Sequence, residues 1–376
     1  MERKLKILKD DLDRWHDQDN TDLNYDYIFS KRQYDSIKIH SFNNITVNRK
    51  LLWNFKRNIG DLYGELVDLE NSHNGKISTF KKQIRASESI LWKILRKLLG
   101  IKYHQAWVEC FKNSENNSKS KSLDSAICFI HSGDDHSWSH FMLDTSHLVA
   151  DTITFLKKNK KIKILLYNAQ NHIEKFLRNI CKIENEITYL WEDTIKVKNL
   201  FITTYSPHST LVNRIVPIKY LSKVRQLYQQ KLNIRGGKYL IYQTRKNVNR
   251  RKVINEDQII DLLKNYSMKN NLEFIEFVHS NYEYEERFDL YYNSKIIVAP
   301  HGGACCHMYA CRPNTIFIEF VVDGSFASIA SSLVDYHILF AEPPFEGSDY
   351  HKNYSINIEK LSKILNNKDT IELKKL

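Results

Sequence analysis

From residue 124 to about residue 233, short apolar runs alternate with longer segments in which apolar and polar residues are mixed. Unbroken apolar runs of this length are typical of strands that are buried on both faces of a parallel sheet. The runs predict strands over residues 124–130, 161–168 and 198–204, and the longer segments predict helices over residues 141–159, 169–181 and 219–233. This alternation indicates βα units and a largely parallel sheet.

The alternation restarts after Gly236 and Gly237. We expect strands over residues 238–244, 272–277, 295–300, 315–320 and 336–342, and helices over residues 256–267, 282–294, 304–312 and 325–335. The pattern therefore predicts two α/β domains in series, with a hinge near residues 235–237. The expected domains span residues 121–235 and 236–345, with an N-terminal extension or part of the first domain over 1–120 and a C-terminal tail or helix over 346–376.

The first 120 residues follow a less regular pattern. Residues 35–53 alternate like two strands joined by a turn at Asn43-Asn44. The segment RASESILWKILRKLLG has apolar residues at helical spacing and ends in Gly100, a residue typical of helix C-caps. Residues 112–122 are rich in Ser, Asn and Lys, which predicts a surface loop.

The composition is that of a globular protein with a basic surface. Of 376 residues, 42% are hydrophobic and 27% are charged, and the formal net charge is +12. This charge favours phosphate-bearing partners, but it is spread along the chain, so we expect most of it on a solvated surface. Six unevenly spaced cysteines predict a reducing compartment rather than a disulfide framework. Without an apolar signal segment or a run long enough to span a bilayer, the sequence predicts a cytoplasmic protein.

The first candidate site is the turn in the stretch IIVAPHGGACCHMYACR. Gly302 and Gly303 permit a tight turn or a close approach of the backbone to a ligand. A helix that begins near Ala304 presents unpaired amides and the positive end of its dipole, which suit an anion. His301 can donate a hydrogen bond to a phosphate oxygen. The alternative is a plain turn with a surface histidine, and so short a motif favours that alternative when taken alone.

The same stretch also contains residue types that bind zinc or act as nucleophiles. These residues are His301, Cys305, Cys306, His307 and Cys311. Adjacent cysteines on a helix point about 100° apart, and no second cluster with CxxC spacing occurs in the sequence. Because cysteine also packs as a small apolar side chain, we expect core packing rather than a metal site or a cysteine nucleophile.

The second candidate is a basic loop that follows the strand expected over residues 238–244. Arginine presents a planar fork that suits phosphate oxygens, so this loop and the His301 turn could converge on one diphosphate. The alternative is a solvated basic loop. A carboxylate at the end of the strand over 315–320, Glu319, is expected to receive ribose hydroxyls, or else to be an exposed strand end. The basic residues of the loop are Arg245, Lys246, Arg250 and Arg251.

The third candidate is the stretch HSGDDHSWSHFMLD, which follows the first expected strand. His140 and Asp144 are four residues apart and would share one face of a helix. Such a pair suits a general base and the carboxylate that orients it. The alternatives are a helix cap and a histidine over the core of the first domain. Asp134, Asp135 and Glu286 are other candidates for the base.

Four blocks of the sequence resemble the glycosyltransferase 61 family, in the order that this family has them. These blocks are SWSHFMLD, YLIYQTRKNVNRRKVINEDQIIDLL, ERFDLYYNSKIIVAP and APHGGACCHMYACRPNTIFIEF, and they cover about residues 137–320. The family includes EGF-domain O-GlcNAc transferase and xylan-decorating enzymes of plants. The chain departs from the family pattern at Ser137, where an asparagine is usual, at Gly303, where an alanine is usual, and in the segment CCHM.

The resemblance implies a GT-B architecture, in which two Rossmann-like domains face each other across a cleft. It also implies inverting transfer from a nucleotide sugar, with UDP as the expected nucleotide, to a hydroxyl of a glycan or glycoprotein, without an essential metal or other cofactor. On the acceptor side, the residues that match the family are His140 and Asp144. The adjacent Arg250 and Gly303 are added to the expected donor site. The residues that match the family's donor motifs are Arg245, Arg251, His301, Gly302, Ala304 and Glu319.

Another GT-B enzyme, such as a fucosyltransferase-like or phosphorylase-like one, is an alternative to this family. Two other classes of function are also compatible with the sequence. A nucleic-acid-binding protein would account for the charge of +12, but it would need basic residues interleaved with exposed aromatic residues on one surface. A non-catalytic protein on the same fold is the other alternative, and the basic residues at the donor loop favour catalysis over it. We therefore expect no nucleic-acid partner. Relatives in eukaryotes work in the secretory pathway, so the alternatives for location are a bacterial or viral cytoplasmic enzyme and a lumenal domain without its anchor.

Overall fold

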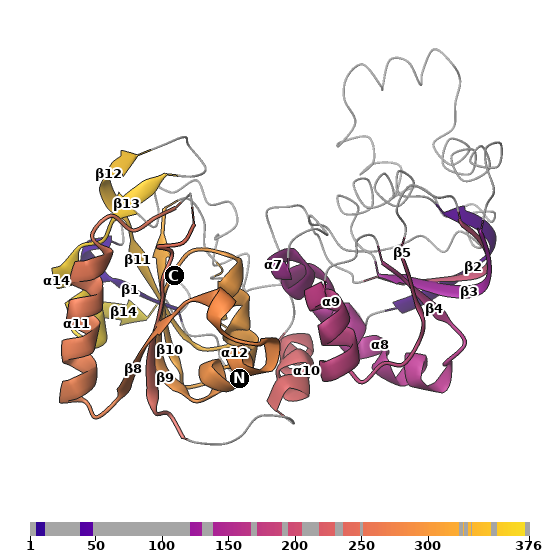
Figure 1. Cartoon of the computed structure of the whole chain (residues 1–376), viewed down its shortest axis with the longest axis horizontal. Coiled ribbons are helices and arrows are strands. Elements are labelled where there is room, and N and C mark those ends of the chain that lie inside the picture. Colours follow the sequence, from indigo (N-terminus) through magenta and orange to yellow (C-terminus); the bar gives the residue numbers. More distant parts are fainter. Residues whose placement is uncertain are drawn as a thin grey trace, which may run out of the picture. The chain divides into compact units, whose positions relative to one another are not determined.

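The computed structural model describes residues 5–11, 38–47, 121–129, 138–166, 171–189, 195–204, 218–229, 236–248, 251–322, 326, 330–331, 333–346 and 352–372 (Figure 1). By its contacts the chain divides into two compact units, one of residues 33–215 and one of residues 1–32 with 216–376. We call them the five-stranded unit and the seven-stranded unit after their sheets. The helix expected over residues 85–100 lies outside the described residues, as does most of the loop expected over 112–122.

The five-stranded unit contains a sheet in the order β2-β6-β3-β4-β5. Strands β6, β3, β4 and β5 are parallel, and β2 is antiparallel to β6. The three strands predicted for this part of the chain are confirmed, while the three-residue β5 was missed because so short a run carries no clear pattern. The bounds are β2 Lys38–Val47, β3 Lys121–Phe129, β4 Lys163–Leu166, β5 Ile187–Tyr189 and β6 Ile195–Thr204.

The turn predicted at Asn43-Asn44 is wrong. Strand β2 runs without interruption through both asparagines, and its pairing with β6 extends from Lys38 opposite Thr204 to Val47 opposite Ile195. A continuous partner strand satisfies the backbone hydrogen bonds of β2, so the extended conformation prevails over the turn preference of the asparagine pair.

The helices predicted for the five-stranded unit are confirmed, with two turns of π-helix as an addition. Long helix α8 is preceded by the short α7 and the π-helix η5, and α9 continues into the π-helix η6. Such π-helical turns are rare and occur mostly as local bulges in α-helices. The bounds are α7 Trp138–His140, η5 Phe141–Thr145, α8 Ser146–Lys158, α9 Asn171–Lys175 and η6 Phe176–Ile180.

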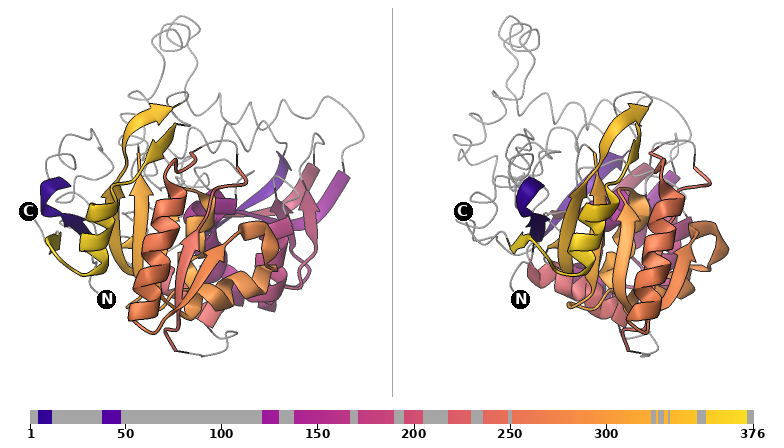
Figure 2. Two further views of the ribbon diagram at one scale, coloured as in Figure 1. Left: turned by 60° about the vertical axis from the view of Figure 1, so that its left-hand side comes forward. Right: turned by 90° about the vertical axis from the view of Figure 1, so that its left-hand side faces the viewer.

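The seven-stranded unit contains a sheet in the order β14-β1-β11-β10-β9-β7-β8. Figure 2 shows the ribbon from two further sides. Six of these strands are parallel and only β14 is antiparallel, which confirms the α/β class. The five strands predicted after residue 237 are all present. The bounds are β1 Leu5–Leu8, β7 Tyr239–Gln243, β8 Glu273–Phe277, β9 Ser294–Pro300, β10 Ile316–Val321, β11 Asp335–Phe340 and β14 Thr370–Glu372; β12 Glu342–Glu346 and β13 Asn353–Ser355 form a separate pair.

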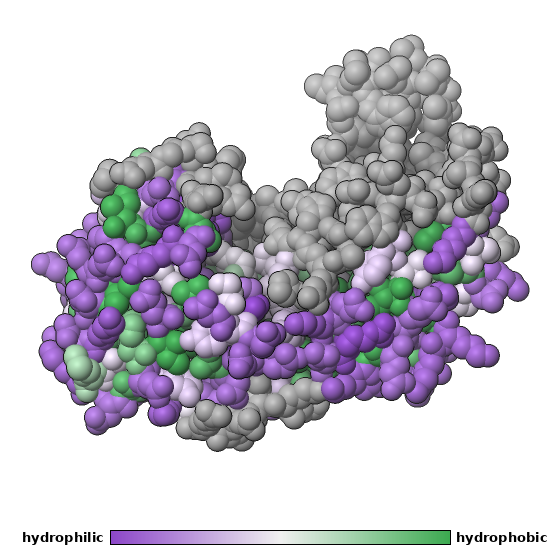
Figure 3. Space-filling view, in the orientation of Figure 1, coloured by the Kyte–Doolittle hydropathy of each residue, from purple (hydrophilic) through white to green (hydrophobic). Residues whose placement is uncertain are grey.

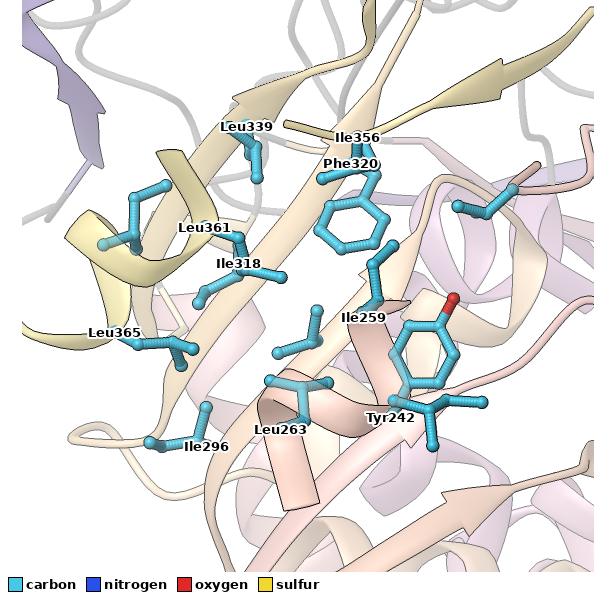
Figure 4. Close-up of a cluster of buried hydrophobic side chains, with 14 of the residues drawn as sticks. Tyr242, Ile259, Leu263, Ile296, Ile318, Phe320, Leu339, Ile356, Leu361 and Leu365 are labelled. Atoms are coloured by element: carbon cyan, nitrogen blue, oxygen red, sulfur yellow. The ribbon is translucent and has the colours of Figure 1, made fainter. Parts of the chain in front are cut away.

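Helices cover both faces of this sheet (Figure 1). On one face, α11 and α14 pack over an apolar cluster that includes Leu263, Ile318 and Leu361 (Figure 4). Helices α10 and α12 and the 3₁₀ helix η8 pack together in the same unit. The bounds are α10 Ile218–Gln229, α11 Glu256–Lys269, α12 Tyr284–Tyr292, η8 Gly303–Ala310 and α14 Ile358–Leu365, with short 3₁₀ turns at η1 Lys9–Asp11 and η7 His279–Asn281.

The N-terminal strand β1 is part of the seven-stranded sheet, a position that the pattern of apolar residues does not predict. It is parallel to β11 and antiparallel to β14. One ion pair holds the strand itself, since Lys6 Nζ lies 3.0 Å from Asp335 Oδ2. A second holds the 3₁₀ turn η1 that follows it, where Lys360 Nζ lies 2.7 Å from Asp11 Oδ1. Residues at opposite ends of the chain therefore complete one sheet.

The surface is mainly hydrophilic where the described residues are visible in Figure 3, with apolar side chains scattered among polar ones. The exposed large apolar side chains among the described residues are Val248, Ile254, Met268 and Phe345. None of the described helices combines the length and the apolar character that crossing a membrane requires.

The order of the strands creates a switch point next to β7. Strand β8, which follows β7 in the chain, lies on one side of β7, and β9 lies on the other side. The strands that come after β7 in the chain therefore lie on opposite sides of it. In open α/β sheets, ligands bind at such a switch point, beyond the carboxyl ends of the strands. The residues that follow β7 and β9 are therefore the first place to look for a site.

Candidate functional site

The basic loop and the histidine turn meet at the switch point. Arg245 follows β7, His301 follows β9, and Arg245 Nη1 donates a hydrogen bond of 3.4 Å to the carbonyl oxygen of His301. Gly302 is buried directly beneath this guanidinium, since a Cβ built on it would lie 2.4 Å from Arg245 Nη1. The glycine is needed for this close approach and not for a special backbone angle, because its φ of 169° is extended.

The turn continues into η8, which is a 3₁₀ helix rather than the expected α-helix. Its first hydrogen bond joins the amide of Cys305 to the carbonyl oxygen of Gly302 at 2.9 Å. The helix therefore supplies no partner for the amides of Gly303 and Ala304, which precede that bond. Gly303 is exposed and Ala304 is half-buried, so both amides suit an anion at this edge of the sheet.

A buried carboxylate holds the start of the basic loop. Glu256, at the start of α11, is 6% exposed, and its Oε1 accepts hydrogen bonds from Tyr242 OH and Thr244 Oγ1 at 2.9 Å each. The same oxygen accepts a bond of 3.1 Å from the backbone amide of Arg245. Glu256 thus fixes the start of the basic loop, a structural role for which the sequence has no signal.

The second half of the basic loop is held by the segment before α14. The side chain of Asn255 donates to and accepts from the backbone of Ile356, at 2.7 and 2.9 Å. Val253 forms a β-bridge with Tyr354, a buried residue. Burial raises the pKa of the Tyr354 phenol above its ordinary value, against the opposing charges of Arg245 and Arg251.

Arg251 has a φ of 57°, in the left-handed region that non-glycine residues rarely adopt. A residue held in this conformation needs support from its surroundings, which the bridge at Val253 supplies. Arg250 lies outside the described residues. Lys246 is exposed and lies 3.1 Å from Asp257, so this part of the loop is solvated as the alternative interpretation held.

Glu319 is fully buried, so the alternative of an exposed strand end is wrong. Its Oε1 lies 2.6 Å from His301 Nδ1, and its Oε2 accepts hydrogen bonds from the backbone amide of Phe326 at 3.1 Å and from Tyr336 OH. The ring of His301 stacks on that of Phe326, with centroids 4.7 Å apart. Tyr336 and Phe326 had no signal in the sequence, because their role depends only on this contact.

The three cysteines after the turn are fully buried, which confirms the packing interpretation. Burial raises the pKa of the Cys305 thiol well above its usual range and that of Cys311 to about 12. His307 is also buried, with Phe288 and Tyr291 as ring neighbours at 5.1 and 5.2 Å. Across the residues that the structure describes, no group of three or more His, Cys, Asp or Glu could hold a metal ion.

The candidate acceptor-side residues lie in the five-stranded unit. His140 is the last residue of α7 and Asp144 lies in η5, but their side chains are not among the described ones. Trp138 and Phe141 of the same block pack as stacked rings 6.1 Å apart, and Phe141 meets Phe176 at 5.5 Å. Part of this block therefore builds the core of its unit.

The other candidates for the base fall in different places. Asp134 and Asp135 are outside the described residues. Glu286 lies in the first turn of α12, where its side chain accepts a bond of 2.7 Å from the backbone amide of Glu283 as part of a capping box. This bond is a structural role that accounts for the carboxylate at that position.

The comparisons with known proteins agree with the geometry of the switch point. Residues 138–318 match the family Glycosyltransferase 61, and the matched segment contains both the basic loop and the His301 turn. No curated protein matches the chain. The resemblance seen in the four sequence blocks is thus confirmed. Residues 138–318 of this chain thus carry the sequence pattern of the glycosyltransferase 61 family.

Proposed function

We propose that this protein is an inverting glycosyltransferase that moves a sugar from a nucleotide sugar, with UDP as the nucleotide, to a hydroxyl of a glycan or glycoprotein. The observation that carries the proposal is the meeting of Arg245, His301 and the start of η8 at the switch point of a parallel sheet. An arginine fork, an imidazole and unpaired helix amides are the groups that recognise phosphate oxygens. The family assignment supports the same chemistry.

In this proposal the donor diphosphate lies between Arg245 and the amides of Gly303 and Ala304. The acceptor oxygen attacks the anomeric carbon, the bond from that carbon to the phosphate oxygen breaks, and its electron pair leaves with the nucleotide. Cationic and N–H groups that face the diphosphate stabilise the charge that develops there, so no metal ion is essential. Attack from the face opposite the leaving group inverts the anomeric centre.

The acceptor hydroxyl must also lose a proton. We assign the base to the five-stranded unit, to His140 with Asp144 as the orienting carboxylate, because the family match includes both residues. This assignment requires a GT-B arrangement in which the two units face each other across a cleft. It is part of the proposal and rests on the family and on the two α/β units.

The direct test is calorimetric titration of the full chain with UDP, GDP and their sugars, with and without EDTA. We expect one nucleotide to bind, with the same affinity in EDTA, and Arg245→Ala and Arg251→Ala to lower that affinity at least tenfold. Lys264→Ala removes an exposed charge from α11 and serves as the matched control. Binding that needs a divalent cation would overturn the metal-free mechanism.

The runner-up function is nucleic-acid binding, which the net charge of +12 favours. It predicts that affinity for DNA or RNA falls steeply with salt and that many surface lysines contribute. If the protein binds no nucleotide but binds DNA or RNA in a salt-dependent way, nucleic-acid binding replaces the proposed function.

A further inference from the structure

A network of three side chains stands behind the proposed phosphate site. Glu319 lies in the middle of β10 and is 0% exposed, while the His301 side chain retains 26% exposure. The carboxylate links His301 to Tyr336 of the neighbouring strand β11. Both Glu319 oxygens are thus engaged by groups of the protein itself.

The number of donors around Glu319 indicates its charge state. The backbone amide of Phe326 can only donate, and Tyr336 OH points at the same oxygen. A carboxyl group that receives two donors on one oxygen is best satisfied in its ionised form. The other oxygen is then also an acceptor and can receive a third donor. That third donor is Nδ1–H of His301, at 2.6 Å.

A fully buried carboxylate is costly unless a positive charge or several donors compensate for it. His301 supplies the nearest such partner, since its Nδ1 and Glu319 Oε1 form an ion pair whenever the imidazole is protonated. With Nδ1 occupied and the ring stacked on Phe326, Nε2 is the ring nitrogen that remains for a ligand.

We propose that Glu319 is a positioning residue, which fixes the ring of His301 with Nδ1–H inward, so that Nε2 faces the diphosphate and donates to it when the imidazole is protonated. Tyr336 holds the carboxylate in turn. This inference rests on the proposed function for the identity of the ligand, but the state of the ring is a property of the protein alone. It differs from the expectation that Glu319 binds ribose, which remains the competing role.

The state of the ring is measured by nitrogen NMR of protein with ¹⁵N-labelled histidine, in which His301→Gln identifies the His301 signals. Under alkaline conditions a free imidazole is neutral and its proton resides mainly on Nε2. In the wild-type protein we expect the proton of His301 to remain on Nδ1. In Glu319→Gln we expect it to redistribute to Nε2. An unchanged proton position in Glu319→Gln would overturn the proposal.

The two roles of Glu319 are separated by titrating two probes, UDP and inorganic pyrophosphate. A positioning role acts on the phosphates, so Glu319→Gln should weaken the binding of both probes by about tenfold. A ribose contact would weaken the binding of UDP alone, and that result would overturn the proposal. Asp335→Asn, which removes a carboxylate from the adjacent strand that pairs with Lys6, is the control and should leave both affinities unchanged.

A double-mutant cycle shows whether Glu319 acts through His301. In the His301→Gln background, Glu319→Gln should cause little further loss of pyrophosphate affinity, because the group that it positions is already absent. Full additivity of the two losses would contradict the proposal. If the wild-type protein binds neither probe, the proposed function fails. The position of the proton on His301 still decides in that case whether Glu319 holds the ring.

Discussion

Arg245 and Gly302 lie so close together that a methyl group on the glycine would stand 2.4 Å from the guanidinium nitrogen Nη1. The atom that would be displaced is the end of a flexible side chain, so the fold can accommodate an alanine there. Gly302→Ala should therefore change the melting temperature little but lower the affinity for UDP or pyrophosphate by about tenfold, because Arg245 must leave its position. Calorimetric titration checks this prediction.

Gly237 offers a matched control for that substitution. A methyl group on Gly237 would stand 2.5 Å from Arg312 Nη2, so the same kind of displacement is imposed on another arginine. Gly237→Ala should keep the wild-type affinity. Equal affinity in the two alanine variants would show that the contact between Arg245 and Gly302 has no part in ligand binding.

Glu256 determines how firmly the basic loop is held. Glu256→Ala leaves three donors without their acceptor, those of Tyr242, Thr244 and the Arg245 amide. Unsatisfied buried groups of this kind cost about 1–3 kcal/mol each before relaxation, so we expect a loss of at least about 2 kcal/mol in the free energy of unfolding. Urea titration measures this loss.

The neighbouring Asp257 provides the comparison. Its side chain is 90% exposed and pairs with Lys246 in solvent, so Asp257→Ala should change the free energy of unfolding by less than about 0.5 kcal/mol. A similar loss in both variants would mean that Glu256 contributes only its charge and not its hydrogen bonds.

Helix α14 carries two lysines that test how β1 and the residues after it are anchored. Lys360 pairs with the fully buried Asp11 at 2.7 Å, whereas Lys363 meets the exposed Asp10 at 3.6 Å. Lys360→Ala leaves a buried carboxylate without its partner and should cost about 3 kcal/mol of unfolding free energy. Lys363→Ala should cost less than about 0.5 kcal/mol. Equal effects in urea titration would refute this account of the N-terminal anchor.

Asp335 should make stability depend on acid pH. Burial alone would raise the pKa of this carboxyl, but the charges of His337 and Lys6 lower it from 3.8 to about 2. A depressed folded-state pKa stabilises the protein above the unfolded value of 3.8 and loses that effect as the pH falls towards 2. A shift of this size corresponds to about 2 kcal/mol.

Asp335→Asn should therefore destabilise the protein by about 2 kcal/mol at pH 5 and by much less near pH 2. Urea titrations of both proteins at a series of pH values give the two curves. Lys6→Met should reproduce part of the effect, because Lys6 Nζ lies 3.0 Å from Asp335 Oδ2. Parallel curves for the wild-type protein and Asp335→Asn would contradict the assignment of this titration to Asp335.

The prediction of strands was most successful where strands are buried on both faces. Strands β7, β9 and β10 read as continuous apolar runs, because both of their faces pack against other parts of the unit. The prediction failed at Asn43-Asn44, where the pairing of β2 with β6 outweighs the local turn preference. The four residues of β1 are too few to identify its partners, since pairing with β11 depends on a contact across most of the chain.

The sequence by itself determined the α/β class, the loop of arginines after one strand and the glycine turn after another, because each depends on local pattern and spacing. Only the tertiary structure decided that β7 and β9 are neighbours, so that Arg245 reaches the carbonyl of His301. It also decided that Glu319 is buried against His301 and Tyr336. These contacts join residues that are distant in sequence, and the order of the strands in the sheet brings them together.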